Sequence, residues 1–274
     1  MIKLVFTDLD GTFVDSRKRV PERNRRVLAL AAQKGVQFVP CTGRNASGIP
    51  PVLAESDAVR YAVCSNGASV VDLREGRALR SVPMDPAQVK ELYAAIGDLP
   101  VTFDVFIGDK VYTERRRLPI VSEAAEGDPV MERFFLNLRT LHDRSLDELL
   151  ELGPVTKVTF LHPGNVHRDA VRAAVDSVEG LEWTYSLANN TEVARAGANK
   201  GAALRWLCEY LGVDAADVVA FGDGDNDLQM IQAAGDGVAM ANAEAKVIAA
   251  ADHVTASCDE AGVAAYLEPM LAAL

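Results

Sequence analysis

The sequence predicts an α/β protein in which a doubly wound parallel sheet is interrupted by an inserted α/β domain. In the first and last thirds of the 274 residues, short apolar segments alternate with helical ones, as in a parallel sheet covered by helices on both faces. The middle third combines helical segments with alternating strands, such as VTFDVFIGDKVYTE and VTKVTFLHP. We therefore expect a core domain formed by residues 1–83 and 189–274, around an inserted domain at residues 84–188.

The first part of the core should begin with a strand at residues 2–7, because the run IKLVFT is mostly apolar and ends at a turn sequence. A helix is expected at residues 22–34, since a glycine at position 35 is a typical helix end. Apolar runs predict two further strands, at residues 36–41 and 61–65, with a short helical piece between them.

The remaining elements follow from the same periodicities. Apolar residues at helical spacing predict helices at residues 86–96, 145–152 and 166–178 of the inserted domain. The second part of the core should contain helices at residues 200–211 and 227–234, strands at 218–221 and 237–240, and a closing helix after Asp259.

Composition excludes several classes of protein. A hydrophobic share of 49% and a charged share of 24% are typical of a folded globular chain. The net charge of −11 argues against a broad nucleic-acid surface. No apolar segment approaches the roughly 18 to 20 residues that span a bilayer, and no leader precedes the first strand, so we expect a cytoplasmic protein without a membrane partner. The cysteines, which should be reduced and buried, are Cys41, Cys64, Cys208 and Cys258.

Four polar stretches share one position, directly after a predicted strand or at the start of a predicted helix. In open α/β sheets, ligands gather at the carboxyl ends of the strands. Each stretch alone has an ordinary reading as a turn or a helix cap, but together they indicate one site. They are DLDGT at residues 8–12, CTGR at 41–44, NK at 199–200 and GDGDND at 222–227.

The acids of these stretches would crowd negative charge at one sheet edge. Carboxylates at short range repel one another and raise each other's pKa unless a cation neutralises them. Oxygen ligands without His or Cys fit Mg²⁺ better than zinc. Thr42, the backbone amides around Gly43 and the ammonium of Lys200 would then supply donors and positive charge for an anion, of which phosphate is the natural candidate.

Such a site suits transfer of a phosphoryl group. Asp8 could attack phosphorus and form an aspartyl-phosphate that water then hydrolyses. Asp10, two residues further along, could protonate the leaving oxygen and afterwards activate water. Mg²⁺, Lys200 and the Thr42 hydroxyl would stabilise charge on the transferring group.

With these residues the chain resembles phosphatases of the haloacid dehalogenase superfamily, in the Cof-like group with a type IIB cap. The motifs DLDGT, TGR, Lys200 and GDGDNDLQM occur in the family's order, and CSNGA, TEVARAGANKGAAL and GVAMANA are further similarities. The resemblance covers essentially the whole chain. It implies a Rossmann-like core and an inserted cap domain that closes over the site and supplies specificity.

The resemblance also implies a role for each site residue. Asp8 corresponds to the nucleophile and a metal ligand, Asp10 to the general acid and base with a carbonyl on the metal, and Asp223 to the remaining metal ligand. The phosphate-binding and catalytic positions are Thr42 with Gly43, Lys200 and Asn226, while Asp227 would orient Lys200 or a metal-bound water.

Two further residues keep alternative interpretations, and Asp225 falls at a variable position outside the metal set. Asn66 fits either a turn with Gly67 or a contact to substrate. For Arg44, a structural ion pair is favoured over substrate contact.

The expected function is Mg²⁺-dependent hydrolysis of a small phosphorylated metabolite, either a sugar phosphate or a phosphorylated cofactor, by a monomer or weak homo-oligomer. Two alternatives remain open. A sugar phosphomutase would use the same residues but pass the phosphoryl group to a second hydroxyl. A sensor of phosphorylated ligands would keep the fold without turnover.

Overall fold

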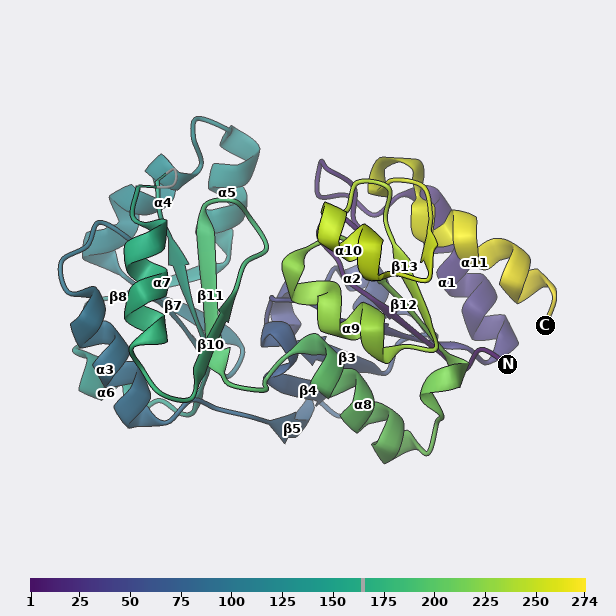
Figure 1. Ribbon diagram of the computed structural model, residues 1–274, viewed down its shortest axis with the longest axis horizontal. Coiled ribbons are helices and arrows are strands. Elements are labelled where there is room, and N and C mark those ends of the chain that lie inside the picture. The colour runs from purple at the N-terminus through teal and green to yellow at the C-terminus, as the bar shows by residue number, and fades with distance from the viewer. Residues whose placement is uncertain (164–165) are drawn as a thin grey trace. The chain divides into compact units, whose positions relative to one another are not determined.

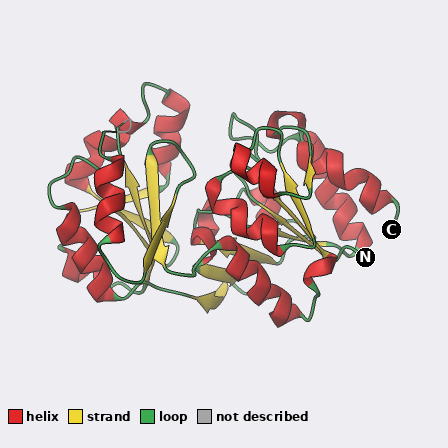
Figure 2. Cartoon of the chain, viewed as in Figure 1, coloured by secondary structure: helices red, strands yellow, loops and turns green. Residues whose placement is uncertain are grey.

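The computed structural model describes residues 1–163 and 166–274 and divides into two compact units. One unit contains Met1–Arg80 and Asn199–Leu274, and the other contains Ser81–Ala198. Each unit has a sheet of its own with helices packed on it (Figures 1 and 2). The chain thus leaves the first unit after its first part and returns to it after completing the second.

The sheet of the first unit is parallel and has the strand order β14-β13-β12-β1-β2. Its strands are β1 (Leu4–Thr7), β2 (Gln37–Pro40), β12 (Val218–Gly222), β13 (Asp236–Ala239) and β14 (His253–Val254). Beside β2, isolated parallel bridges join Phe38 to Val59 and Cys41 to Val63 of β3 (Tyr61–Cys64). Strand β3 also belongs to a three-stranded sheet with β4 (Ser69–Asp72) and β5 (Arg77–Ser81). The central strands β1 and β12 therefore come from opposite ends of the chain.

Helices bury both faces of this parallel sheet. The alternation of side chains along β1 places Val5 in one apolar cluster and Leu4 and Phe6 in another. The Val5 cluster includes α1 (Glu22–Lys34) and α11 (Gly262–Ala272), and the other includes α8 (Lys200–Leu211) and α9 (Leu228–Ala233). Two short helices, α2 (Pro51–Ala54) and α10 (Ala245–Ala250), complete this unit's α-helices. The doubly wound core predicted from the sequence is confirmed.

The inserted unit contains a mixed six-stranded sheet in the order β10-β11-β9-β6-β7-β8. The strands are β6 (Asp104–Ile107), β7 (Lys110–Glu114), β8 (Arg139–His142), β9 (Val155–Leu161), β10 (Leu181–Thr184) and β11 (Asn190–Arg195). The helices are α3 (Pro86–Ile96), α4 (Leu118–Ala124), α5 (Pro129–Asn137), α6 (Leu146–Leu150) and α7 (Arg168–Asp176). A core of apolar side chains from α3, α7 and the sheet holds this unit together.

The second boundary of the inserted unit lies later than expected. Residues 189–198 were assigned to the core, but β11 pairs with β10 and with β9 in the inserted sheet. The unit therefore ends at Ala198 and begins at Ser81. The sequence NTEVAR reads as a strand but contains nothing that specifies its partner, because pairing across a sheet is a tertiary contact.

Local sequence signals predicted the bounds of several helices correctly. The helices expected at residues 22–34, 86–96 and 200–211 have these bounds in α1, α3 and α8. Gly35 ends α1 in the left-handed conformation, with φ of 70°, as a glycine after a helix usually does. The four cysteines are free and buried, as expected. Among the described residues, no helix is both long and apolar enough to traverse a bilayer.

Candidate active site

The predicted motifs meet at the carboxyl edge of the parallel sheet. Strand β1 lies between β12 and β2, with Thr7 opposite Phe221 on one side and Pro40 on the other. The residues that follow these strands therefore emerge side by side, and they include Asp8, Thr42 and Asp223. Motifs that are distant in sequence thus share one edge because the sheet is parallel.

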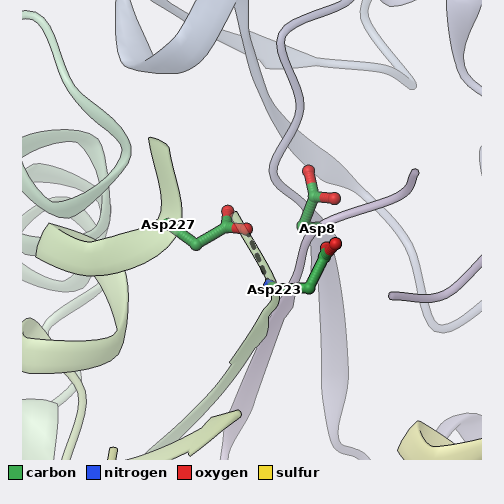
Figure 3. Close-up of side chains that lie close together, drawn as sticks. All are labelled: Asp8, Asp223 and Asp227. Atoms are coloured by element: carbon green, nitrogen blue, oxygen red, sulfur yellow. Dashed lines mark hydrogen bonds between the residues drawn. The ribbon is translucent and has the colours of Figure 1, made fainter. Parts of the chain in front are cut away.

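Three carboxylates cluster at this edge: Asp8, Asp223 and Asp227 each offer an oxygen within 4.8 Å of the others (Figure 3). Asp8 is 6% exposed and Asp227 is fully buried. The second carboxylate oxygen of Asp227 accepts the backbone N–H groups of Asp223 and Gly224, both at 3.0 Å. Asp227 therefore ties together the loop that carries Asp223.

Lys200 supplies the positive charge of this cluster. It is the first residue of α8, where Asn199 caps the helix by accepting the N–H of Ala202. Its Nζ is fully buried and lies 2.6 Å from Asp8 Oδ1 and 2.6 Å from Asp227 Oδ1. Burial alone would lower the pKa of Lys200, but the charges of Asp227 and Asp8 outweigh burial and raise it. Lys200 therefore stays a cation.

The acids carry more negative charge than Lys200 compensates. Burial raises the pKa of Asp8 well above its usual range, and Asp227 and Asp223 raise it further, against the lowering effect of Lys200. Burial and the charge of Asp227 raise the pKa of Asp223 to about 7. A cation would relieve this repulsion. Carboxylate oxygens without a His or Cys fit a hard divalent cation such as Mg²⁺, so these residues suit the metal expected from the sequence.

Asp10 lies outside the carboxylate cluster and is held by two cations. Arg44 donates to both of its oxygens, at 2.9 and 2.7 Å, and Lys18 Nζ lies 2.8 Å from Oδ1. Burial alone would raise the pKa of Asp10, but Arg44 and Lys18 lower it to about 2. Asp10 is therefore a carboxylate in this arrangement. Arg44 makes the ion pair that was favoured for it, and Lys18 is a partner that no sequence motif indicated.

Thr42, Asn66 and Asn226 form a connected polar group in the same unit. The buried Thr42 accepts the N–H of Arg44 on its hydroxyl and the N–H of Asn66 on its carbonyl, at 3.2 and 3.0 Å. Asn226 Nδ2 donates to Asn66 Oδ1 at 3.2 Å. Asn66 has a φ of 55° in a turn that continues into Gly67, so its turn conformation and its contact to Asn226 coexist. Gly43 directly follows Thr42 on this loop.

Two residues of the quoted motifs have contacts that the sequence did not indicate. Asp225 pairs with Lys246 and is not part of the carboxylate cluster, as expected. Thr12, the last residue of DLDGT, donates its hydroxyl to Asp223 Oδ1 at 2.7 Å. Thr12 lies in the DLDGT stretch but was not among the predicted site residues, and only the fold identifies its partner.

Comparison with known proteins agrees with this geometry. The family model for haloacid dehalogenase-like hydrolases matches residues 5–267. YxeH of Bacillus subtilis (strain 168) is 32% identical over 100% of both chains. The pyridoxal phosphate phosphatase YbhA of Escherichia coli (strain K12) is 28% identical, over 92% of this chain and 92% of its own length.

A solved structure has the same fold. The crystal structure of a haloacid dehalogenase-like hydrolase from Bacteroides thetaiotaomicron superposes with a TM-score of 0.84 at 28% identity, and the match covers 98% of this chain and 100% of that one. The family match spans nearly the whole chain, including every motif of the carboxylate edge. The chain therefore belongs to the haloacid dehalogenase-like hydrolases and is a Cof-like phosphatase of that family.

Proposed function

We propose that this chain hydrolyses phosphate monoesters of small metabolites through a phosphorylated Asp8. The observation that carries the proposal is the convergence of the buried Asp8 and Lys200 with the partly buried Asp223 at the carboxyl edge of the sheet. A carboxylate held beside a fixed ammonium and a second metal-binding acid is equipped to attack phosphorus while its surroundings balance the charge.

In the first step, a carboxylate oxygen of Asp8 forms a bond to phosphorus as the bond to the leaving oxygen breaks. The leaving oxygen takes a proton from Asp10, which has to be protonated and released from Arg44 and Lys18 to donate it. Lys200 and the Thr42 hydroxyl stabilise the phosphoryl oxygens, assisted by Asn226 and the backbone around Gly43. Asp227 keeps Lys200 in place through their buried ion pair.

In the second step, the oxygen of a water forms a bond to phosphorus as the bond between phosphorus and the Asp8 oxygen breaks, which releases inorganic phosphate and restores the Asp8 carboxylate. Asp10 accepts the proton of this water, and its ionised form in the structure is the form that can do so. The same carboxyl thus serves both steps in opposite protonation states.

Mg²⁺ would be held by Asp8 and Asp223, with the carbonyl of Asp10 as a third ligand. When bound, it neutralises part of the acid cluster and polarises a phosphoryl oxygen. Binding also favours the carboxylate form of Asp8, whose pKa is raised without the metal. Asp8 would then be ionised when substrate arrives.

The substrate class is a small phosphorylated metabolite, either a sugar phosphate or a phosphorylated cofactor. The similarity to a pyridoxal phosphate phosphatase supports a phosphorylated cofactor as the substrate. Its test is a phosphate-release screen over a panel of sugar phosphates, flavin mononucleotide and pyridoxal phosphate, with Mg²⁺ and with EDTA. Release from at least one substrate that EDTA abolishes supports the proposal, while transfer to a second sugar hydroxyl would identify a mutase.

The nucleophile is tested by Asp8→Asn, which should abolish turnover without unfolding the protein. Asp225→Asn is the matched control, since Asp225 lies in the GDGDND motif beside Asp223 but outside the carboxylate cluster. Mass spectrometry of acid-quenched wild-type enzyme should locate the phosphoryl group on the peptide that contains Asp8. Retained activity in Asp8→Asn would contradict the assignment.

A further inference from the structure

Thr12 contacts the acid cluster from a position that the proposed mechanism does not use. It is fully buried in the loop after β1, and its hydroxyl donates to Asp223 Oδ1 at 2.7 Å across 211 positions of sequence. A hydroxyl that donates to a carboxylate restricts the rotation of that carboxylate, and hydrogen bonds to charged acceptors are stronger than neutral ones. Thr12 therefore constrains how Asp223 presents its oxygens.

Gly11, in the same loop, also lies against the Asp223 carboxylate. Gly11, with φ of 87°, lies so close to Asp223 that a Cβ atom would be 2.4 Å from Oδ2. The carbonyl of Gly11 accepts a hydrogen bond from Asn242 Nδ2 at 2.8 Å, and the Asn242 side chain also accepts the N–H of Cys258 at 2.8 Å. Thr12 thus donates from a loop that is anchored independently of Asp223.

We infer that Thr12 is a positioning residue for the metal site: its hydroxyl fixes the Asp223 carboxylate and thereby sets the affinity for the divalent cation. This inference rests on the proposed function, in which Asp223 is a metal ligand. A metal site loses affinity when its ligands must be ordered during binding, and outer partners of ligands typically contribute about 10- to 100-fold. Replacing the hydroxyl by a methyl group should weaken cation binding by about 10-fold or more.

The test compares Thr12→Val with Thr12→Ser and the wild-type protein. Valine has nearly the shape of threonine without the donor, whereas serine keeps the donor. Thr255→Val is the matched control, because the Thr255 hydroxyl donates to the carbonyl of Gly262 at 2.7 Å and touches no carboxylate of the cluster. Binding of Mn²⁺ is measured without substrate, from the loss of the free-ion electron paramagnetic resonance signal, and binding of Mg²⁺ by competition.

The inference predicts weaker Mn²⁺ and Mg²⁺ binding in Thr12→Val, most of the affinity restored in Thr12→Ser, and no change in Thr255→Val. In turnover, Thr12→Val should need more Mg²⁺ for half-saturation, while KM for substrate at saturating Mg²⁺ stays near the wild-type value. A general loss of structure would instead change both the Mg²⁺ concentration for half-saturation and the KM for substrate. It would also lower the thermal unfolding temperature of the metal-free protein.

Unchanged cation affinity in a folded Thr12→Val protein would overturn the inference and leave the proposed function intact. Wild-type protein that binds neither cation would instead contradict the proposed metal site. If Thr12→Val does not fold, Thr12→Ala removes the hydroxyl without placing a methyl group at its position, and the same comparison with Thr12→Ser decides the outcome.

Discussion

Removing the buried ammonium of Lys200 should destabilise the metal-free protein strongly at neutral pH. Lys200→Met keeps a long, flexible side chain and removes the ammonium, so the change leaves little cavity. Asp8 and Asp227 then lose a partner that lies 2.6 Å from each. Breaking a buried ion pair by removing one partner typically costs about 3–5 kcal/mol. Without Lys200, the uncompensated carboxyls become a penalty on the folded state.

Protonation limits this penalty and makes it depend on pH. A carboxyl with an ordinary pKa of about 3.9 can be protonated at pH 7 at a cost of about 4 kcal/mol, and at pH 5 for about 1.5 kcal/mol. Burial already raises the pKa of Asp8 in the folded protein, and loss of Lys200 raises it further. A carboxyl with a raised folded pKa destabilises the fold above its unfolded pKa, and the wild type shares part of this effect, so the deficit should shrink by at most about 2–3 kcal/mol between pH 7 and pH 5.

The assay is urea unfolding in EDTA at both pH values. In a Trp183→Phe background, Trp206 is the remaining tryptophan and lies in the unit that contains Lys200, so tryptophan fluorescence reports the unfolding of that unit. Lys246→Met is the control, because it removes the same charge from a partly exposed ion pair and should cost less than about 1 kcal/mol. Equal stability of Lys200→Met and wild type at pH 7, or a deficit that is the same at pH 5, would refute the reasoning.

Two further predictions concern the loop and the acids beside it. Gly11→Ala should destabilise the protein by about 1–2 kcal/mol from its left-handed φ of 87° alone and should lower Mg²⁺-dependent turnover, because the new methyl group displaces Asp223. Thermal unfolding and turnover measure both effects, and wild-type turnover would contradict them. The metal-free protein should lose stability as the pH rises from about 4 to about 7, because the Asp223 pKa of about 7 lies above its unfolded value. Mg²⁺ should restore most of the lost stability at pH 8. A stability that rises with pH, or that Mg²⁺ leaves unchanged, would show that the acid cluster does not cause the pH dependence.

Much of the fold could be predicted because its signals are local. Periodic apolar residues and a terminal glycine determine where α1 lies, and its expected bounds match the structure. The assignment of β11 failed for the opposite reason. Its sequence is compatible with a strand in either unit, and its partners β9 and β10 are specified only by packing.

The candidate site shows the same division. Asp8 and Asp223 could be placed together from the sequence because each follows a parallel strand, and such strands end at one edge of a sheet. Lys18 could not be found in this way, since it reaches Asp10 from a turn in which its φ is 61°. No motif spacing encodes that direction.

The sequence by itself therefore determined the family, the doubly wound core and the set of acids that meet with Lys200, because motif order and strand periodicity are properties of the linear chain. Only the tertiary structure decided how those acids differ. Asp10 is paired with Arg44 and Lys18, while Asp223 receives the hydroxyl of Thr12. These differences arise from the direction of side chains and the burial of charge, which depend on residues that meet only after folding.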